Sequence, residues 1–474
     1  MPTHYIGRQM LLLDLVGVAD AQAVQAQAVR TFKEETLPRL DRLFDRLCPA
    51  GYTLSLDSLD LDLGQVAPGK LGDLLTEKLL QALESALSKA METPARAAAY
   101  AQAQDTPAAG TQYATDAARQ VGMWLTFLER GYLPGWNGLP DPRTWESRLL
   151  QSLADEPAWR GPLGTLLRRV PIARQRLVRQ FSPELIRQLW GWSELPVWAY
   201  EAAEALDVIW EEWSVTERFQ ERLMEVLFSD ETITPDSMAR RLKTWWTASH
   251  IPVENALAQT REVFDHQEVT SEVRAVLTIL SQGTDPDTPA APAPLADKKP
   301  SLPLPEGLYV PHAGLVLLHP FLPTFFRAVG LLAPDEGTFL NETTQERGIH
   351  LLAYLATSIE AAPEYELPFV KLLCGWPLDL PVRRVFSLSE TELYECNELL
   401  TAVVGYWEAL KNTSPDGLRE GFLQRPGKLT LKEDQWVLHI EQNALDILLD
   451  RLPWGLSLVK LPWMPEMVHV NWLF

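Results

Sequence analysis

Tryptophan is concentrated in one stretch of this chain, and the concentration limits what that stretch can fold into. Of the 17 tryptophans, 11 lie between positions 124 and 246, at Trp124, Trp136, Trp145, Trp159, Trp190, Trp192, Trp198, Trp210, Trp213, Trp245 and Trp246. Most of them fall on the faces or ends of segments whose apolar residues recur at helical spacing. Because each packed tryptophan buries on the order of 200 Å², an isolated helix would leave these side chains in water. The pattern therefore predicts a compact or stacked array of helices.

The composition of the rest of the chain divides it into five parts. A chain of 474 residues with 46% hydrophobic residues is too long for one ordinary core, so two or three domains are expected. Two stretches lose apolar periodicity and are rich in Ala, Gln or Pro, which predicts linkers. The predicted parts are an N-terminal module (1–91), an Ala/Gln-rich linker (92–115), a tryptophan-rich helical region (116–282), a Pro-rich linker (283–304) and a C-terminal domain (305–474).

The N-terminal module is predicted to have the order β-α-β-α. The first strand is expected over Tyr5–Val16, whose apolar run indicates burial on both faces. The second is expected over Leu54–Leu63, and we expect the two strands to pair. The apolar alternation of the second strand changes phase near Asp57, which indicates a bulge. Asp20 is a candidate N-cap for the first helix.

The middle region is predicted to be wholly helical, and the C-terminal domain to mix helices and strands. Helices of the middle are expected over 121–130, 143–154, 164–180, 183–190, 197–213, 216–228, 235–248 and 253–281. C-terminal helices are expected over 315–329, 343–357, 369–373, 390–410, 416–424 and 444–449, and strands over 428–432, 436–441, 456–461 and 467–472. The predicted fold class is therefore α+β and predominantly helical.

The balance of charge limits the partners. The chain carries 42 Lys+Arg against 63 Asp+Glu, which gives a formal net charge of -21. Such a surface repels phosphate, so nucleic acid and anionic membranes are poor candidates and other proteins are better ones. The apolar run 10–19 is interrupted by Asp14, and we interpret it as a strand instead of a signal peptide. No stretch approaches 18 uninterrupted apolar residues, so no membrane span or stable membrane insertion is expected.

Chemistry-bearing residues are present without the spacing that catalysis or metal binding requires. The cysteines Cys48, Cys374 and Cys396 are odd in number and outside C-x-x-C spacing, which predicts neither disulfides nor a zinc site. A reducing cytoplasm is the default compartment for such a chain. The histidines show no H-E-x-x-H pattern, and no G-x-S-x-G elbow occurs. We therefore expect no enzyme activity, no metal and no cofactor.

One segment imitates a nucleotide-binding loop. Residues 64–70, GQVAPGK, satisfy G-x-x-x-x-G-K between an expected strand and an expected helix. A P-loop needs Ser or Thr at the next position to hold Mg²⁺, and that position is Leu71. Pro68 also removes an amide that would point at phosphate. A strand-to-helix turn is favoured, and a nucleotide-binding switch at Gly64–Leu71 is kept as a remote alternative.

Seven residues are candidates for contact with a partner. They are Asp60, Asp62, Trp376, Trp454, Trp463, Arg419 and Arg425. The two aspartates, with nearby Asp57, lack the Gly and the distal Glu of a calcium loop, so we favour the solvated face of a strand, with a basic partner surface as the alternative. Each tryptophan lies beside a proline, which favours core packing over an aromatic anchor at an interface. The two arginines either pair with carboxylates of their own domain or contact a partner.

Ordered segments at both ends of the chain resemble a known family. The last third contains AGLVLLHPFLP (313–323), KLLCGWP (371–377), DGLREGFLQRPGKL (416–429) and LPWGLSLVKLPWM (452–464). The start contains YIGRQMLLLDL (5–15) and LDSLDLDLG (56–64). In this order the segments resemble the tape-measure family of bacterial contractile injection systems. The resemblance implies a part of a phage-tail-like particle that sits within the inner tube during assembly and helps to set its length, without catalysis.

Two functional hypotheses follow from this resemblance. The leading one is a non-enzymatic, tape-measure-like assembly protein that sets or templates inner-tube length through protein contacts. The alternative is a cytoplasmic assembly scaffold or cargo-loading adaptor of the same system. As one continuous helix the chain would span at most about 700 Å at ~1.5 Å per residue. A packed middle would span far less, which favours the alternative.

The resemblance also implies partners and a location. Inner-tube, baseplate or cap proteins are expected to contact the chain, a tube subunit is a candidate partner for Arg419 and Arg425, and self-association is left open. The chain is expected in the cytoplasm during assembly and then within the lumen of the released particle.

Overall fold

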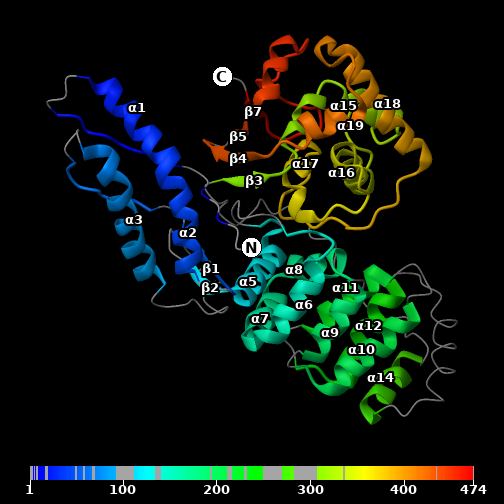
Figure 1. Cartoon of the computed structure of the whole chain (residues 1–474). Coiled ribbons are helices and arrows are strands. Elements are labelled where there is room, and N and C mark those ends of the chain that lie inside the picture. The colour runs from blue at the N-terminus through cyan, green and yellow to red at the C-terminus, as the bar shows by residue number, and fades with distance from the viewer. Residues whose placement is uncertain are drawn as a thin grey trace. The chain divides into compact units, whose positions relative to one another are not determined.

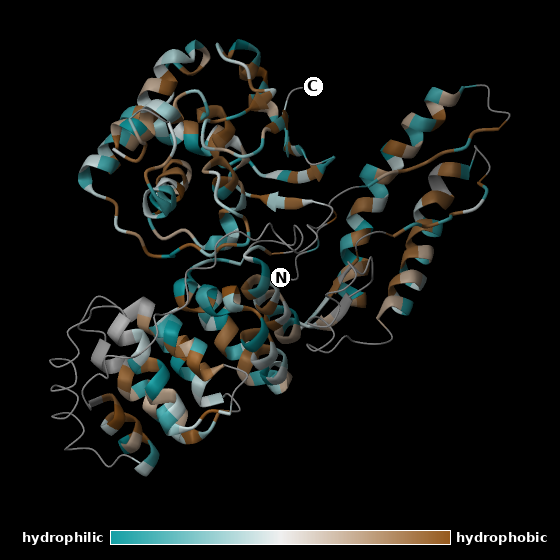
Figure 2. Ribbon diagram, turned by 180° about the vertical axis from the view of Figure 1, so that it is seen from behind, coloured by the Kyte–Doolittle hydropathy of each residue, from teal (hydrophilic) through white to brown (hydrophobic). Residues whose placement is uncertain are grey.

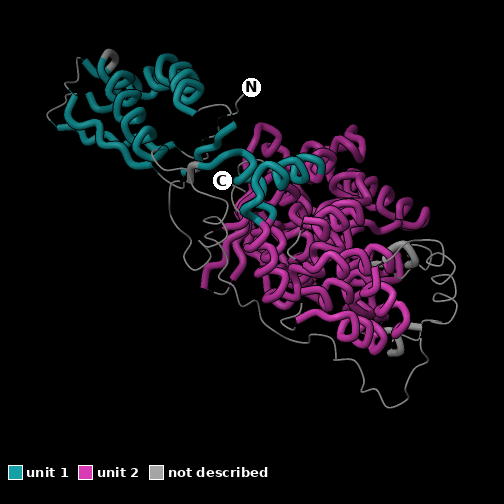
Figure 3. Tube along the Cα trace, turned by 90° about the horizontal axis from the view of Figure 1, so that it is seen from below, with its two compact units in different colours: residues 1–124, 136–138, 147–159 teal, residues 125–135, 139–146, 160–474 magenta. Residues whose placement is uncertain are grey.

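The structure is a computed structural model of the whole chain (Figure 1). The residues described are 4, 6, 9–16, 20–48, 51–56, 59–66, 70–91, 112–133, 140–192, 195–210, 216–228, 232–248, 270–281, 307–334, 337–433 and 435–472. The chain divides into two compact units (Figure 3). Unit 1 comprises residues 1–124, 136–138 and 147–159, and unit 2 comprises residues 125–135, 139–146 and 160–474. The fold is α+β and predominantly helical, as predicted.

Unit 1 is built on a pair of helices packed over a small core. The first is a continuous run of α1 (Ala21–Thr31), the π-helix η1 (Phe32–Thr36) and α2 (Leu37–Leu47), and the second is α3 (Leu71–Ala90). Asp20 caps α1 as predicted, because its Oδ1 accepts a hydrogen bond from the Ala23 amide at 3.0 Å. The core between the helices contains Ala28, Leu71 and Leu75.

The strands predicted for the N-terminal module are largely wrong. The described residues of the first one, 9–16 among them, form no strand. The second is limited to β1 (Tyr52–Ser55), which pairs antiparallel with β2 (Gln112–Thr115), four residues that the sequence had assigned to a linker. The predicted burial of the first segment on both faces is also wrong, because Met10, Leu12 and Val16 are exposed. Leu13 of this segment and Leu63 of the second pack against the core between α1 and α3. The predicted bulge at Asp57 lies outside the described residues.

The tryptophan-rich region forms helices with the boundaries that follow. They are α5 (Asp116–Arg130), α6 (Trp145–Asp155), the 3-10 turn η4 (Pro157–Trp159), α7 (Arg160–Arg169), α8 (Pro171–Gln180), α9 (Pro183–Trp192), α10 (Val197–Trp210), α11 (Thr216–Leu227), α12 (Pro235–Ala248) and α14 (Ser271–Ser281). Within unit 2, α11 packs against α8, α10 and α12, and α14 packs against α10 and α12. Trp124, Trp145, Trp159 and Trp190 are buried, as their distribution predicted.

One helix predicted in this region is two. The expected helix 164–180 breaks at Val170, whose backbone is extended and precedes Pro171. Proline disfavours helical geometry in the residue before it, and its own ring suits the first turn of a new helix. Residues 253–269 of the last predicted helix lie outside the described residues.

The C-terminal part of unit 2 surrounds a mixed sheet. Its strands are β3 (Leu308–Val310), β4 (Gly427–Lys432), β5 (Gln435–Ile440), β6 (Leu458–Val459) and β7 (Val468–Asn471), in the order β3-β4-β5-β7-β6. All neighbours are antiparallel except β5 and β7, which are parallel. The predicted hairpin is confirmed, because Lys432 of β4 lies opposite Gln435 of β5.

Helices and short turns complete this part. They are η6 (Ala313–Leu318), α15 (Leu322–Ala328), α16 (Glu342–Thr357), η7 (Glu364–Glu366), α17 (Pro368–Leu373), α18 (Glu390–Tyr406), η8 (Glu408–Leu410), α19 (Pro415–Leu418), η9 (Arg419–Leu423) and η10 (Ala444–Arg451). The single helix predicted over 315–329 is wrong. A buried 3-10 segment precedes Pro320, and α15 restarts with Pro323 in its first turn. Gly314 permits this close packing, because a Cβ there would lie 1.7 Å from the Phe422 carbonyl oxygen.

Candidate functional site

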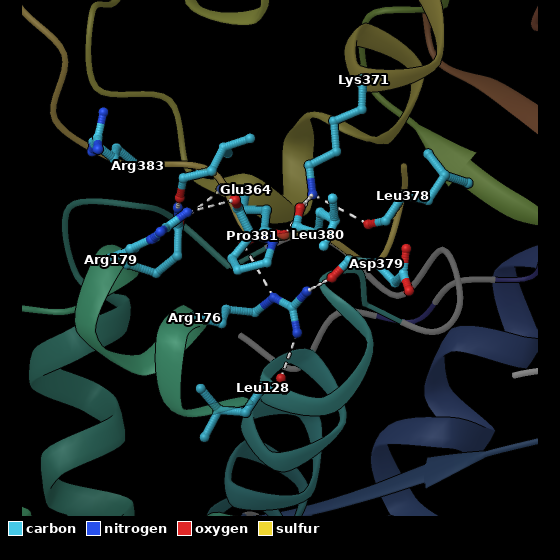
Figure 4. A network of polar contacts seen from close by, with 12 residues as sticks. Leu128, Arg176, Arg179, Glu364, Lys371, Leu378, Asp379, Leu380, Pro381 and Arg383 are labelled. Atoms are coloured by element: carbon cyan, nitrogen blue, oxygen red, sulfur yellow. Dashed lines mark hydrogen bonds and ion pairs between the residues drawn. The ribbon is translucent and has the colours of Figure 1, made fainter. Parts of the chain in front are cut away.

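A buried carboxylate holds two cations inside unit 2. Glu364 accepts a hydrogen bond from Arg176 Nε at 3.1 Å and another from Lys371 Nζ at 2.5 Å (Figure 4). The side chains of Arg176 and Glu364 are 0% exposed and that of Lys371 is 1% exposed. An unpaired charge in such a place costs several kcal/mol, so each member depends on the others. We call these three residues the ionic junction.

Prolines and one glycine place the three side chains. Arg176 lies on α8, which starts at Pro171, and Lys371 lies on α17, which starts at Pro368. Glu364 opens the short turn η7. Gly131 approaches the pair from a third segment with φ +80, and a Cβ at that position would lie 2.7 Å from both Arg176 Nη2 and Glu364 Oε1. The junction therefore needs glycine there for space as well as for backbone conformation.

Backbone carbonyls accept further hydrogen bonds from the two cations. Arg176 Nη1 donates to Leu128 O and Nη2 donates to Asp379 O. Lys371 Nζ donates to Leu378 O at 3.2 Å and Leu380 O at 2.8 Å. Carbonyls of the segment 378–380 thus face the two cations, which stabilises an irregular stretch of chain that has no ladder of its own.

The C-terminal end of α8 is tied to the same stretch. Gln180 Nε2 donates to Val382 O at 2.8 Å, while its Oε1 accepts from the Glu364 amide at 2.9 Å. Arg179 Nη1 donates to Pro381 O at 3.2 Å. In the other direction, the Arg384 amide donates to Arg179 O at 3.1 Å. Helix α8 and the C-terminal part are therefore joined by charged, amide and backbone hydrogen bonds together.

Aromatic rings pack beside the junction. The Tyr365 hydroxyl donates to Pro140 O at 3.0 Å, and its ring meets those of Trp145 and Phe127 edge to face, with centroids 4.9 Å and 5.8 Å away. Burial raises the pKa of the Tyr365 hydroxyl, so it stays a donor. The rings exclude water from the polar contacts, which strengthens those contacts.

The junction holds two cations and one carboxylate, and the pKa of Lys371 is lowered there. Burial lowers the pKa of Lys371 to about 8; Glu364 opposes the shift and Arg176 adds to it. Because all contacts of the Nζ lead to a carboxylate or to carbonyl oxygens, the group is not presented to a substrate. The geometry serves to hold segments together and offers no catalytic chemistry.

The comparisons with known proteins identify the family. The model of a family described as contractile injection system tape measure protein matches residues 3–472. The chain belongs to this family. No match was found among curated proteins or among solved structures. The description of the family is that of a structural component of the injection system.

The three candidate tryptophans, for which core packing was favoured over partner contact, pack against the interior of this tape measure protein. Trp463 Nε1 donates to Leu373 O at 2.8 Å and Trp454 Nε1 donates to Leu317 O at 3.1 Å. Trp376 Nε1 donates to Leu380 O at 3.1 Å, the carbonyl that Lys371 also contacts. Trp376 and Trp463 are buried, and Trp454 is partly buried against the core. These contacts match the core-packing alternative.

The two predicted arginines are also largely buried. Arg425 is bonded to Asp446 and donates to Glu441 O at 3.2 Å, and Arg419 is bonded to Asp416 at 2.6 Å. Each therefore pairs with a carboxylate of its own domain.

The two predicted aspartates lie in unit 1, and both are exposed. Asp62 Oδ1 accepts a hydrogen bond from the Gly64 amide at 2.8 Å. The two aspartates thus belong to a different compact unit from the other five candidates, which lie in unit 2.

The residues of the ionic junction were missed by the sequence analysis. The available signal was Lys371, the single charge within the apolar run LPFVKLLCGWP (367–377). A lysine in such a run has to be paired if the run is buried, although the sequence does not say with which carboxylate.

Other kinds of site find no support in the described residues. There, no group of three or more His, Cys, Asp or Glu side chains is arranged to hold a metal ion. Within the same residues, no helix is both long and apolar enough to cross a membrane. Residues 67–69 of the nucleotide-loop imitation lie outside the described part, and Lys78 Nζ donates to Leu63 O and Gln65 O at its edge, both at 3.0 Å.

Proposed function

We propose that this tape measure protein sets or templates the length of the inner tube of a contractile injection particle, through protein contacts and without a cofactor. The observation that carries the proposal is the family match over residues 3–472, which takes in both compact units. Its partners are inner-tube, baseplate or cap proteins. The chain acts in the cytoplasm during assembly and then lies within the lumen of the particle.

The packing within unit 2 limits how length is set. The helices α8, α10, α11 and α12 are folded against one another, so their lengths do not add along one axis. Even the 20 residues of α3 span only ~30 Å at ~1.5 Å per residue. Tube length therefore depends on where the compact units bind. Additional copies of the chain, or added spacer segments, would change the tube length in fixed increments.

Deletion of the gene tests the proposal, with tube lengths measured by negative-stain electron microscopy. We expect tubes and sheaths of uncontrolled length, or no particles, and restoration by the wild-type gene. Insertion of extra helical pairs after Ser281 is expected to lengthen tubes by at most ~1.5 Å per added residue, and by less if the pairs pack. Particles of normal number and length in the deletion strain would refute the function.

The packed middle supports a second candidate, a cytoplasmic scaffold or cargo-loading adaptor of the same system. Its tertiary contacts make unit 2 a compact body instead of a rod. Quantitative mass spectrometry of purified particles separates the two candidates. A tape measure is retained in a fixed ratio to tube subunits, whereas a scaffold or adaptor stays in the cell. Insertion variants that build tubes of unchanged length would also favour the scaffold.

A further inference from the structure

An extended segment of unit 1 is most exposed to solvent at alternate side chains. In residues 9–16, Met10, Leu12 and Val16 are 69%, 81% and 91% exposed, whereas Leu11 and Leu15 on the other face are 37% and 38% exposed. Leu13, between them, packs against the core formed by α1 and α3. This alternation has the period of a β-strand, and Figure 2 shows the segment as an extended, mainly hydrophobic stretch near α1. The outward face is therefore apolar at three positions of four, with Asp14 at the remaining one.

Within the described residues, the backbone of this segment also has no hydrogen-bond partner. No strand pairing in the described part of the chain involves residues 9–16 either. The second extended segment, 59–66, differs, because Lys78 binds its carbonyls at Leu63 and Gln65. An extended segment with unpaired N–H and C=O groups and apolar side chains is a template for another strand. Met10 and Leu12 follow each other on the outward face, and Val16 lies beyond Asp14. Clustered apolar side chains that are exposed mark an interaction site when polar residues border them.

The charges near the segment select the kind of strand that fits. Asp14 on the outward face, and Asp60 and Asp62 on the neighbouring segment, are exposed carboxylates. If two copies of the chain paired through residues 9–16, an antiparallel pair centred on Leu13 would place the two Asp14 side chains diagonally on one face. A parallel pair in register would place them side by side. Like charges in such positions are destabilising, so a second copy fits worse than a strand that carries a cation.

We propose that residues 9–16 bind a β-strand of another particle protein, and that this strand is apolar at alternate positions and carries Lys or Arg opposite Asp14. The backbone of the segment supplies the hydrogen bonds, Met10, Leu12 and Val16 supply the apolar contacts, and the carboxylate selects the cation. This inference rests on the proposed function, because it assigns the chemical class of one partner that the protein contacts require.

Peptide binding to the full-length chain tests the inference. The probes are a short synthetic peptide of alternating Val and Thr with one central Lys, the same peptide with Glu for Lys, and a version with prolines that cannot pair. Binding is measured by fluorescence anisotropy. We expect the Lys peptide to bind about fivefold to tenfold more tightly than the Glu peptide, the effect of replacing an attractive cross-strand charge pair by a repulsive one. The proline peptide is expected not to bind.

Variants then assign the binding to this segment. Leu12→Asp is expected to abolish binding of the Lys peptide, and Asp14→Lys to reverse the preference so that the Glu peptide binds better. The matched control is Val385→Asp, because Val385 is an apolar residue 74% exposed in unit 2, and this variant should bind as the wild type does. Unchanged thermal midpoints for all three variants exclude misfolding.

Several results would overturn the inference. Equal binding of the Lys and Glu peptides, or binding that survives Leu12→Asp, would do so. A concentration-dependent dimer in sedimentation equilibrium that Leu12→Asp abolishes would assign the segment to a second copy instead. The assay needs no particle, so its failure leaves the proposed function standing, whereas normal tube lengths in the deletion strain would refute that function and leave the peptide result standing.

Discussion

The ionic junction of unit 2 buries charged side chains, whereas the extended segment 9–16 of unit 1 exposes apolar ones. At the junction, three charges are fully enclosed and each has partners, with distances of 2.5 Å and 3.1 Å to the shared carboxylate. In the extended segment, large apolar side chains of the kind usually found in a core are exposed to solvent, and Leu12 is 81% exposed. The contrast teaches that unit 2 pairs these buried charges within itself. In unit 1, the described residues leave an apolar face exposed, and a partner strand is what we propose for it.

Removal of the shared carboxylate should produce the largest effect. Glu364→Leu leaves Arg176 and Lys371 buried without their counter-ion, and we expect the free energy of unfolding to fall by about 3–5 kcal/mol. Urea unfolding followed by tryptophan fluorescence measures the loss. Glu398→Leu, at an exposed position of α18, is the control and should change stability by no more than about 0.5 kcal/mol. A loss below about 1 kcal/mol for Glu364→Leu would contradict the dependence of the three charges on one another.

A triple replacement sharpens the same point. Arg176→Met, Glu364→Leu and Lys371→Met together remove every charge of the junction while keeping similar volume. Buried ion pairs replaced in this way are often neutral or stabilising, so the triple variant should recover most of what Glu364→Leu loses. Failure to recover would show that the hydrogen bonds to Leu128, Asp379 and Leu380 matter more than the charges do.

The buried tryptophans of unit 2 give the next largest effect. Trp463→Ala removes a ring that packs against Phe326 and Phe339, with centroids 5.3 Å and 5.2 Å away, and it leaves the Leu373 carbonyl without its donor. We expect a loss of about 3–5 kcal/mol and failure of assembly without any change of tube length. The control is Tyr406→Ala, which removes a ring 67% exposed. Equal losses from the two variants would contradict the interior role of Trp463.

Acid should weaken unit 2 through a buried histidine. Burial lowers the pKa of His350 to about 4, and Arg383 and Arg347 add to the shift. In the unfolded chain this histidine takes up its proton near pH 6.5, before the folded chain does, so its contribution to stability is lost as pH falls from about 6.5 toward 4. His350→Phe keeps a ring against Phe386 and removes the titration. Unfolding curves at several pH values should show a flatter pH dependence for this variant, and parallel curves would contradict the assignment.

The smallest change in stability is expected in the exposed segment. Leu12→Asp should alter the free energy of unfolding by no more than about 0.5 kcal/mol, because the side chain is 81% exposed. Leu13→Asp should cost more, since Leu13 packs against the core of unit 1. In cells, Leu12→Asp should nevertheless reduce the number of complete particles counted by electron microscopy. A large loss of stability from Leu12→Asp would mean that the segment belongs to the core, and the contrast with unit 2 would disappear.

Single helices and a hairpin, which depend on residues close together in the sequence, were predicted well. Helix α12 occupies residues 235–248 as predicted, and the β4–β5 hairpin forms around the turn at Glu433. Both depend on apolar periodicity and turn residues within the segment itself. The failures at 164–180 and 315–329 were local as well, because Pro171 and Pro320 interrupt patterns that periodicity alone would continue.

The failed strand prediction has a different cause. The apolar run in residues 9–16 predicted a paired strand buried on both faces. Within the described residues it has no pairing strand, and Met10, Leu12 and Val16 are exposed while Leu13 packs against the core. A strand is defined by its neighbour, which the sequence of one segment does not contain. The partner of β1 instead came from residues 112–115, inside a stretch whose composition indicated a linker.

The sequence by itself determined the family, the predominantly helical α+β class, the acidic surface and most helices, because these follow from composition, ordered motifs and periodicity within short windows. Only the tertiary structure decided that Arg176 meets Glu364 across 188 positions and that Lys371 joins them. It also decided that residues 9–16 find no pairing strand in the part of the chain that the structure describes. The physical reason is that a charge or a strand edge specifies the kind of partner it needs, while folding selects which partner reaches it.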